Sequence, residues 1–195
     1  MTVEIYKILV LGPPNAGKTS IVTQFTESDF QESYSPTVGL NIKISEVTLP
    51  EGVVKMTVMD LGGQDSFSEL RKTYYRGAHY VMFVYDMTDV SHFAEIPKWY
   101  EGICLDLCES MGGFFPGALV ANKADLAENQ QVETRRGKQL AQLLNLDYFE
   151  TSAKTGENVG ELFIHAASQC HIRMFGIKDS DHTEVTMRSG IFDRL

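Results

Sequence analysis

Cysteine is scarce in this chain of 195 residues, which contains only Cys104, Cys108 and Cys170 and no CxxC pair. An odd and sparse set of cysteines excludes a disulfide framework and favours a reducing compartment. Cys104 and Cys108 stand four residues apart, which places them on one face of a predicted helix, and no histidine lies near them in the sequence. We therefore interpret these two cysteines as packing residues rather than as metal ligands.

Long apolar runs and an excess of basic residues are also absent. The longest apolar run extends from Tyr80 to Tyr85, far short of the ~20 residues that a membrane-spanning helix needs. Residues 1–7 include Glu4 and no apolar core, so we do not expect a secretory signal peptide there. Lysine and arginine total 17 against 26 acidic residues, a net charge of −9, which argues against binding to nucleic acid through bulk charge.

The chain does contain a regular alternation of apolar runs with amphipathic stretches. Its length predicts one domain over residues 1–175, followed by a flexible tail over residues 176–195. The alternation predicts an α/β fold, with a mostly parallel sheet, one antiparallel hairpin and helices on both faces. Ligands of such sheets bind beyond the carboxyl ends of the strands. Strands are predicted at residues 5–11, 40–49, 53–60, 80–86, 117–121 and 147–151, and helices at residues 18–25, 91–111 (interrupted near its start by Pro97), 134–144 and 159–175.

Residues 12–19, GPPNAGKT, fit the phosphate-binding pattern G-x-x-x-x-G-K-[ST] between a predicted strand and a predicted helix. In such a loop the backbone N–H groups and the helix N-terminus bind phosphate. The lysine reaches the β- and γ-phosphate oxygens, and the threonine hydroxyl can ligate Mg²⁺. The alternative, a glycine-rich turn with a stray lysine, is disfavoured by the flanking strand and helix. The residues predicted to hold the phosphates are Asn15, Ala16, Gly17, Lys18, Thr19 and Ser20.

Pro13 and Pro14 are unusual in a loop that works by donating N–H groups, because each proline removes one donor. The donors from Asn15 onward remain. We infer that the two prolines line the γ-phosphate edge of the loop and stiffen it.

Two further stretches contain groups that suit Mg²⁺ and the γ-phosphate. In Asp60-Leu61-Gly62-Gly63-Gln64, which follows a predicted strand, Asp60 can hold Mg²⁺ directly or through water. The backbone N–H of Gly63 can approach the γ-phosphate, and Gln64 can orient an attacking water. In residues 34–39, YSPTVG, the hydroxyl of Thr37 can supply a second protein ligand to Mg²⁺ and report the γ-phosphate. The alternative for residues 60–64 is a simple turn at the end of a strand. The alternative for residues 34–39 is a Ser-Pro turn, and spacing alone does not favour either interpretation of that segment.

Two polar tetrapeptides follow the last two predicted strands. In Asn122-Lys123-Ala124-Asp125, the carboxylate of Asp125 can accept two parallel hydrogen bonds from guanine, a donor pair that adenine lacks. The aliphatic stem of Lys123 can cover a purine face. In residues 151–154, TSAK, a backbone N–H can meet guanine O6. Either tetrapeptide alone would be read as a polar helix cap, but their order after the phosphate loop favours base recognition.

These elements, in this order, resemble the Ras superfamily of small GTPases over about residues 5–175. The resemblance implies a P-loop NTPase fold with a six-stranded sheet and five helices, and a cycle between an active GTP-bound and an inactive GDP-bound form. It implies GTP/GDP and Mg²⁺ as ligands. By position, it assigns base stacking to Phe30 and phosphate covering to Tyr34. It assigns Mg²⁺ to Thr19, Thr37 and Asp60, the γ-phosphate to Gly63, the base to Asn122, Lys123, Asp125, Ser152, Ala153 and Lys154, and catalysis to Gln64, Lys18 and Thr37.

Within the superfamily the chain is most similar to the Rab branch, as the stretches at 74–78 (YYRGA), 84–88 (VYDMT) and 150–159 (ETSAKTGENV) indicate. Met59 replaces the tryptophan that Rab proteins carry before their aspartate. The DLGGQ motif is closer to Arf proteins and to a divergent ciliary Rab. Thr2 excludes Arf-type myristoylation. No cysteine follows Cys170, and the tail has three basic and four acidic residues, so it is not a polybasic anchor.

The expected function is hydrolysis of GTP to GDP and phosphate in a switch that regulates intracellular membrane or ciliary trafficking. The alternatives are a GTP-binding scaffold with negligible turnover, which Pro14 keeps open, and an ATP-dependent P-loop kinase, which Asp125 disfavours. The resemblance implies effectors that bind switch I and switch II, an exchange factor and a GTPase-activating protein. We expect a monomer that is cytoplasmic and peripheral to endomembranes or the cilium, with membrane attachment only through an anchor beyond Leu195 or through a partner.

Overall fold

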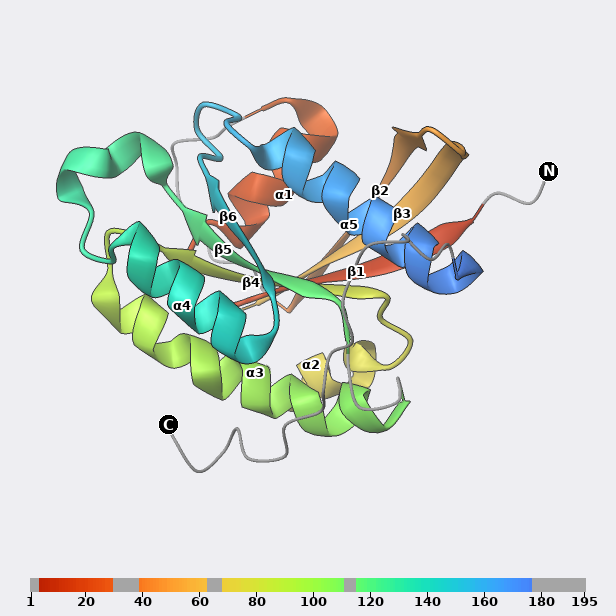
Figure 1. Ribbon diagram of the computed structural model, residues 1–195, viewed down its shortest axis with the longest axis horizontal. Coiled ribbons are helices and arrows are strands. Elements are labelled where there is room, and N and C mark those ends of the chain that lie inside the picture. Colours follow the sequence, from red (N-terminus) through yellow and green to blue (C-terminus); the bar gives the residue numbers. More distant parts are fainter. Residues whose placement is uncertain (1–3, 30–38, 63–67, 111–114, 177–195) are drawn as a thin grey trace.

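The computed structural model describes residues 4–29, 39–62, 68–110 and 115–176 (Figure 1). Strands and helices alternate along the chain, as the sequence predicts. The strands are β1 (Ile5–Leu11), β2 (Leu40–Leu49), β3 (Gly52–Leu61), β4 (Tyr80–Asp86), β5 (Gly117–Asn122) and β6 (Asp147–Thr151). The helices are α1 (Lys18–Glu27), α2 (Ser68–Tyr75), α3 (Val90–Ser110), α4 (Thr134–Leu144) and α5 (Val159–Phe175), with a 3₁₀ helix η2 (Ala124–Asn129).

The strands form one six-stranded sheet in the order β2-β3-β1-β4-β5-β6. β2 and β3 form the antiparallel hairpin, and every other neighbouring pair is parallel. β3, β1, β4 and β5 lie inside the sheet. β4 and β5 are buried along their whole length, as expected for parallel strands covered on both faces. The predicted fold class is confirmed.

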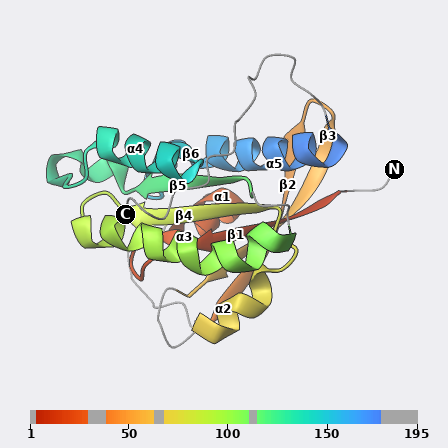
Figure 2. The ribbon, with the colours of Figure 1, turned by 60° about the horizontal axis from the view of Figure 1, so that its bottom comes forward.

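Two apolar cores hold the helices against opposite faces of the sheet. One core unites α1 and α5 with the sheet through residues such as Ile21, Phe163 and Ala166. The other unites α2, α3 and α4 with the opposite face through residues such as Ile103 and Leu144. Figure 1 shows α5 and α1 on one side of the sheet and α3 and α4 on the other, and Figure 2 shows α2 beside α3.

Two local features differ from the sequence prediction. α3 continues through Pro97 as one helix, although an internal proline costs about 3 kcal/mol of helix stability. Ile96, Ile103 and Leu107 are all fully buried against the sheet, and this tertiary packing offsets the local cost. The 3₁₀ helix η2 was not predicted from the sequence. Among the described helices, none is both long and apolar enough to cross a bilayer.

Candidate functional site

The loop between β1 and α1 has a backbone that only glycine allows at two positions. Gly12 and Gly17 have φ angles of 139° and 87°. A Cβ atom on Gly12 would lie 2.1 Å from the carbonyl oxygen of Val84, and one on Gly17 would lie 2.2 Å from Nδ2 of Asn122. Asn15 also has a positive φ of 65°. The loop therefore lies directly on β4 and β5, and its glycines permit this close approach.

Lys18, the first residue of α1, is buried and folds back over this loop. Its Nζ donates hydrogen bonds to the carbonyl oxygens of Gly12 and Pro13, each at 2.8 Å. These two bonds hold the ammonium group at the mouth of the loop, beside the backbone donors at the start of α1. This is the position in which a lysine can neutralise a phosphate bound by the loop.

Thr19 and Asp60 come together at the same end of the sheet. The parallel register of β1 and β3 pairs Val10 with Asp60, and the hydroxyl of Thr19 donates a hydrogen bond to the carboxylate of Asp60. Asp60 is fully buried. A hydroxyl next to a carboxylate is a hard oxygen donor set, which fits Mg²⁺. In the part of the chain that is described, no group of three or more His, Cys, Asp and Glu side chains is placed to hold a metal. Mg²⁺ prefers six oxygen ligands, which commonly include phosphate and water oxygens beside a few protein groups.

Asn122, at the end of β5, connects three loops of the site. Its Nδ2 donates to the carbonyl oxygen of Ala16, 3.0 Å away. Its Oδ1 accepts from the hydroxyl of Thr151 and from the backbone N–H of Ala153, each at 3.2 Å. Because the side chain is 1% exposed, its polar groups serve to join the phosphate loop to the loop after β6.

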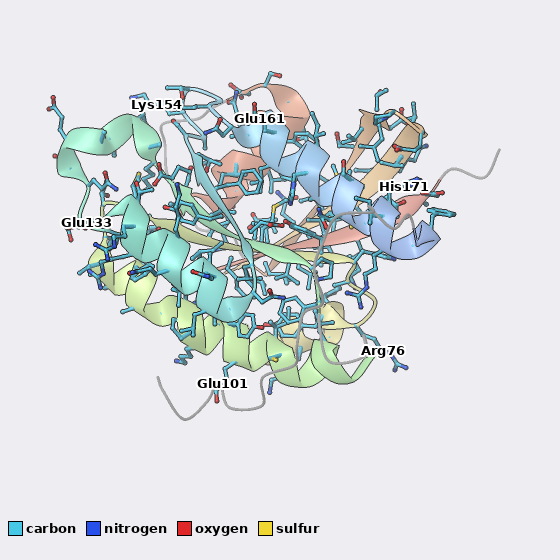
Figure 3. The ribbon with its side chains drawn as sticks, in the orientation of Figure 1. Arg76, Glu101, Glu133, Lys154, Glu161 and His171 are labelled. Atoms are coloured by element: carbon cyan, nitrogen blue, oxygen red, sulfur yellow. The ribbon has the colours of Figure 1, made fainter. Side chains whose placement is uncertain are left out.

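The carboxylate of Asp125, at the start of η2, is held by a neighbouring loop. The hydroxyl of Ser152 donates to Oδ1 of Asp125 at 2.6 Å and accepts from the backbone N–H of Thr155 at 3.1 Å. Ser152 is fully buried, Ala153 is buried, and Asp125 is exposed. One carboxylate is therefore presented to solvent in a fixed orientation. Lys154 is exposed on the loop that joins β6 to α5 (Figure 3).

The residues predicted from the sequence divide into two groups. The structure brings the phosphate-loop residues, Asp60, the tetrapeptide at 122–125 and the residues at 152–154 to the carboxyl ends of neighbouring strands. The others lie outside the described residues, and their roles stay predictions: Phe30, Tyr34, Thr37, Gly63 and Gln64. At the border of the undescribed segments, the backbone N–H of Gly62 donates to the carbonyl oxygen of Gly39 at 2.8 Å.

Sequence reasoning missed one charged residue of this site, Asp86. This aspartate ends β4, and its Oδ2 lies 2.5 Å from Nζ of Lys123. The signal was present, since Asp86 is the only charged residue in the apolar stretch Tyr80–Asp86. Its partner, however, is 37 positions along the chain, and only the pairing of β4 with β5 brings the two together.

The chain is similar to known proteins across the whole of this site. It matches the model of the Ras family over residues 7–172. It is 35% identical to Ras-related protein RIC1 of Oryza sativa subsp. japonica over 170 residues, which are 87% of this chain and 82% of the relative. It is 34% identical to Ras-related protein Rab-8B of Dictyostelium discoideum over 180 residues, 92% and 87% of the two chains. It is 34% identical to GTP-binding protein ypt1 of Schizosaccharomyces pombe over 170 residues, 87% and 82% of the two chains.

Proposed function

Because the chain belongs to the Ras family, whose members are GTPases that bind GTP or GDP with Mg²⁺, we propose that the loops after β1, β3, β5 and β6 form its guanine-nucleotide site. The observation that carries this proposal is the hydrogen-bonding of Asn122. Its side chain bonds to the phosphate loop on one side and to the loop after β6 on the other. Through it, the phosphate-binding and base-binding groups belong to one site.

At the base end, Asp125 accepts hydrogen bonds from N1–H and the exocyclic amino group of guanine. The hydrogen bond from Ser152 orients this carboxylate before the ligand arrives, which reduces the entropy lost on binding. The stem of Lys123 packs on the purine face, opposite Phe30. Backbone N–H groups in residues 152–154 meet guanine O6.

At the phosphate end, Lys18 and the N–H donors of Asn15–Ser20 bind the phosphate oxygens, and Tyr34 covers them. Thr19, Asp60 and Thr37 would hold Mg²⁺, which when bound neutralises the charge that develops on the β- and γ-phosphate oxygens. Gln64 orients the attacking water, with the N–H of Gly63 on the γ-phosphate. We expect slow intrinsic hydrolysis, which an activating protein accelerates by supplying positive charge, an effect of roughly 10³–10⁵ in rate.

The chain is a small GTPase of the Rab-like group, which acts in vesicle trafficking. We propose that it binds effectors through the segments around Thr37 and Gln64, and that an exchange factor and a GTPase-activating protein control its nucleotide state. The DLGGQ motif at 60–64 favours traffic to the cilium. A GTP-binding scaffold with negligible turnover is the second candidate, because Pro14 lies half-buried in the phosphate loop, where its ring would obstruct a catalytic group from an activating protein.

The experiment that tests the site is nucleotide competition on wild type and Asp125→Asn. Wild type should prefer GDP and GTP strongly over ATP. In Asp125→Asn we expect guanine nucleotide to bind about 10–100-fold more weakly, since hydrogen bonds to a charged group are each worth about 1.5–3 kcal/mol. Xanthine nucleotide should gain affinity, because its edge has the donor–acceptor pattern that an amide can match. Calorimetric titration measures each affinity.

The matched control is Glu128→Gln, which removes a carboxylate from an exposed position of the same 3₁₀ helix. Its affinity for GDP should stay within twofold of wild type. If ATP displaces labelled GDP as effectively as GTP does, the assignment of the base site is wrong.

A further inference from the structure

Asp86 is a buried carboxylate whose two oxygens have different partners. It is 5% exposed. Its Oδ1 accepts hydrogen bonds from the backbone N–H and the hydroxyl of Thr88, at 2.8 and 2.6 Å. Its Oδ2 forms the 2.5 Å ion pair with Nζ of Lys123. The turn after β4 thus fixes one side of the carboxylate, and the other side is left to hold the lysine.

The backbone around this ion pair is fixed by the sheet. β4 and β5 pair in parallel, with Asp86 opposite Asn122, and the backbone N–H of Met87 donates to the carbonyl oxygen of Asn122 at 3.1 Å. Asp86 and Lys123 therefore extend from neighbouring strand ends whose spacing is set. The ion pair adds a side-chain link to this backbone link.

Lys123 has a backbone conformation that residues other than glycine seldom adopt. Its φ and ψ are 70° and 38°, in the left-handed region, which is unfavourable for an L-residue. Its carbonyl oxygen accepts the N–H of Leu126 at 2.9 Å and so begins the turn that carries Asp125. A contact that holds Lys123 in this conformation therefore also affects where Asp125 is presented.

The exposures of the two partners indicate what the ion pair does for a ligand. The side chain of Asp86 is 8% exposed, whereas that of Lys123 is 33% exposed. The charged end of the lysine is anchored inward, and part of its chain remains accessible at the site. An unanchored lysine stem samples many rotamers. A stem anchored at both ends offers a preformed apolar surface, and ordering it costs less on binding.

We propose that Asp86 is a positioning residue for the guanine base, acting through Lys123. This inference rests on the proposed nucleotide site and gives Asp86 a supporting role behind Lys123. Asp86 does not touch the ligand. It holds the lysine stem across the place of the purine ring, and its removal should accelerate release of the nucleotide.

The test is the dissociation rate of a fluorescent GDP in the presence of Mg²⁺, measured in a double-mutant cycle. Asp86→Asn removes the charge and keeps the size of the side chain. We expect it to accelerate dissociation about tenfold in the wild-type background and less than twofold in Lys123→Met, where the ion pair is already absent. Asp86→Glu keeps the negative charge, so we expect GDP to dissociate from it more slowly than from Asp86→Asn.

Two measurements separate positioning from a loss of folding. Glu46→Gln breaks the ion pair with Lys55 on the β2–β3 hairpin, 3.3 Å long and exposed, and should leave the dissociation rate unchanged. Urea unfolding of each variant without added nucleotide shows whether stability has fallen. Equal acceleration by Asp86→Asn in both backgrounds would overturn the proposal. Failure of the wild-type protein to bind GDP in preference to ATP would instead refute the nucleotide site itself.

Discussion

Single side chains in this site are oriented by hydrogen bonds to other groups of the protein. Ser152 is buried and directs its hydroxyl at the carboxylate of Asp125, and Lys18 is held by two carbonyl oxygens of its own loop. Groups fixed in this way lose little freedom when a ligand binds. In the proposed site, specificity for guanine would therefore depend on the residues that orient the contacting groups as well as on the contacting groups themselves.

In the proposed mechanism, Gln64 orients the attacking water. Gln64→Leu keeps the volume of the side chain and removes both its hydrogen-bond donor and its acceptor. We expect single-turnover GTP hydrolysis to slow by about 10–100-fold, since misplacing a reacting group by about 1 Å can cost ~10² in rate. Nucleotide affinity and folding should persist.

Gln139→Leu, at an exposed position of α4, is the matched control and should hydrolyse GTP at the wild-type rate. If Gln64→Leu also hydrolyses GTP at that rate, Gln64 has no catalytic role and the scaffold alternative is favoured.

Among the elements, α4 packs unusually closely on the sheet. Gly137 lies in this helix, and a Cβ atom there would come within 2.6 Å of the hydroxyl of Tyr148 and 2.7 Å of that of Tyr85. Burial raises the pKa of Tyr85 to about 12. The hydroxyl of Tyr148 donates to Glu150 at 2.8 Å, and so does that of Thr134 at 2.5 Å. Glycine is therefore required at this position by the contact between helix and sheet.

The same substitution should have opposite effects on two helices. Gly137→Ala should lower the free energy of unfolding by about 1–3 kcal/mol, because the methyl group overpacks the contact with the tyrosines. Gly160→Ala, on an exposed turn of α5 where nothing lies within 4 Å of the added Cβ, should raise it by about 0.5–1 kcal/mol through helix propensity. Urea unfolding measures both. If both variants are stabilised, the tight contact of α4 with the sheet does not exist in solution.

For the molecule as a whole, the pH dependence of stability includes a contribution from His79, which precedes β4. Its Nδ1 accepts the backbone N–H of Lys7 at 2.9 Å, a bond that only the neutral ring can make. Burial lowers the pKa of His79 below its usual 6.5, and the charge of Lys7 lowers it further. The unfolded chain therefore binds this proton at a higher pH than the folded protein does.

Stability from this group is present above about pH 6.5 and is lost as the pH falls below that value, because the unfolded state then binds more protons. His79→Asn retains an acceptor for the N–H of Lys7 without a titrating group. We expect the free energy of unfolding of wild type, relative to this variant, to decrease on acidification. Denaturant titrations of wild type and His79→Asn at several pH values around and below 6.5 measure the difference between their free energies of unfolding. The contributions of the other histidines cancel in this difference. A difference independent of pH would contradict the prediction.

Local sequence determined most of the secondary structure. The predicted bounds of β1, β2, β4, β6, α4 and α5 are those observed, because apolar runs, turn residues and helical periodicity act over a few neighbouring residues. The motifs for phosphate and base likewise stand in short stretches of sequence. Their shared location follows from the rule that parallel strands end at one edge of a sheet.

Tertiary structure alone decided which residues contact one another across these loops. Asn122 bonds to Ala16 across 106 positions, and Asp86 meets Lys123 because β4 neighbours β5. The continuation of α3 through Pro97 depends on burial against the sheet. Spacing in the sequence carries no information on such contacts, because they depend on the order of strands in the sheet.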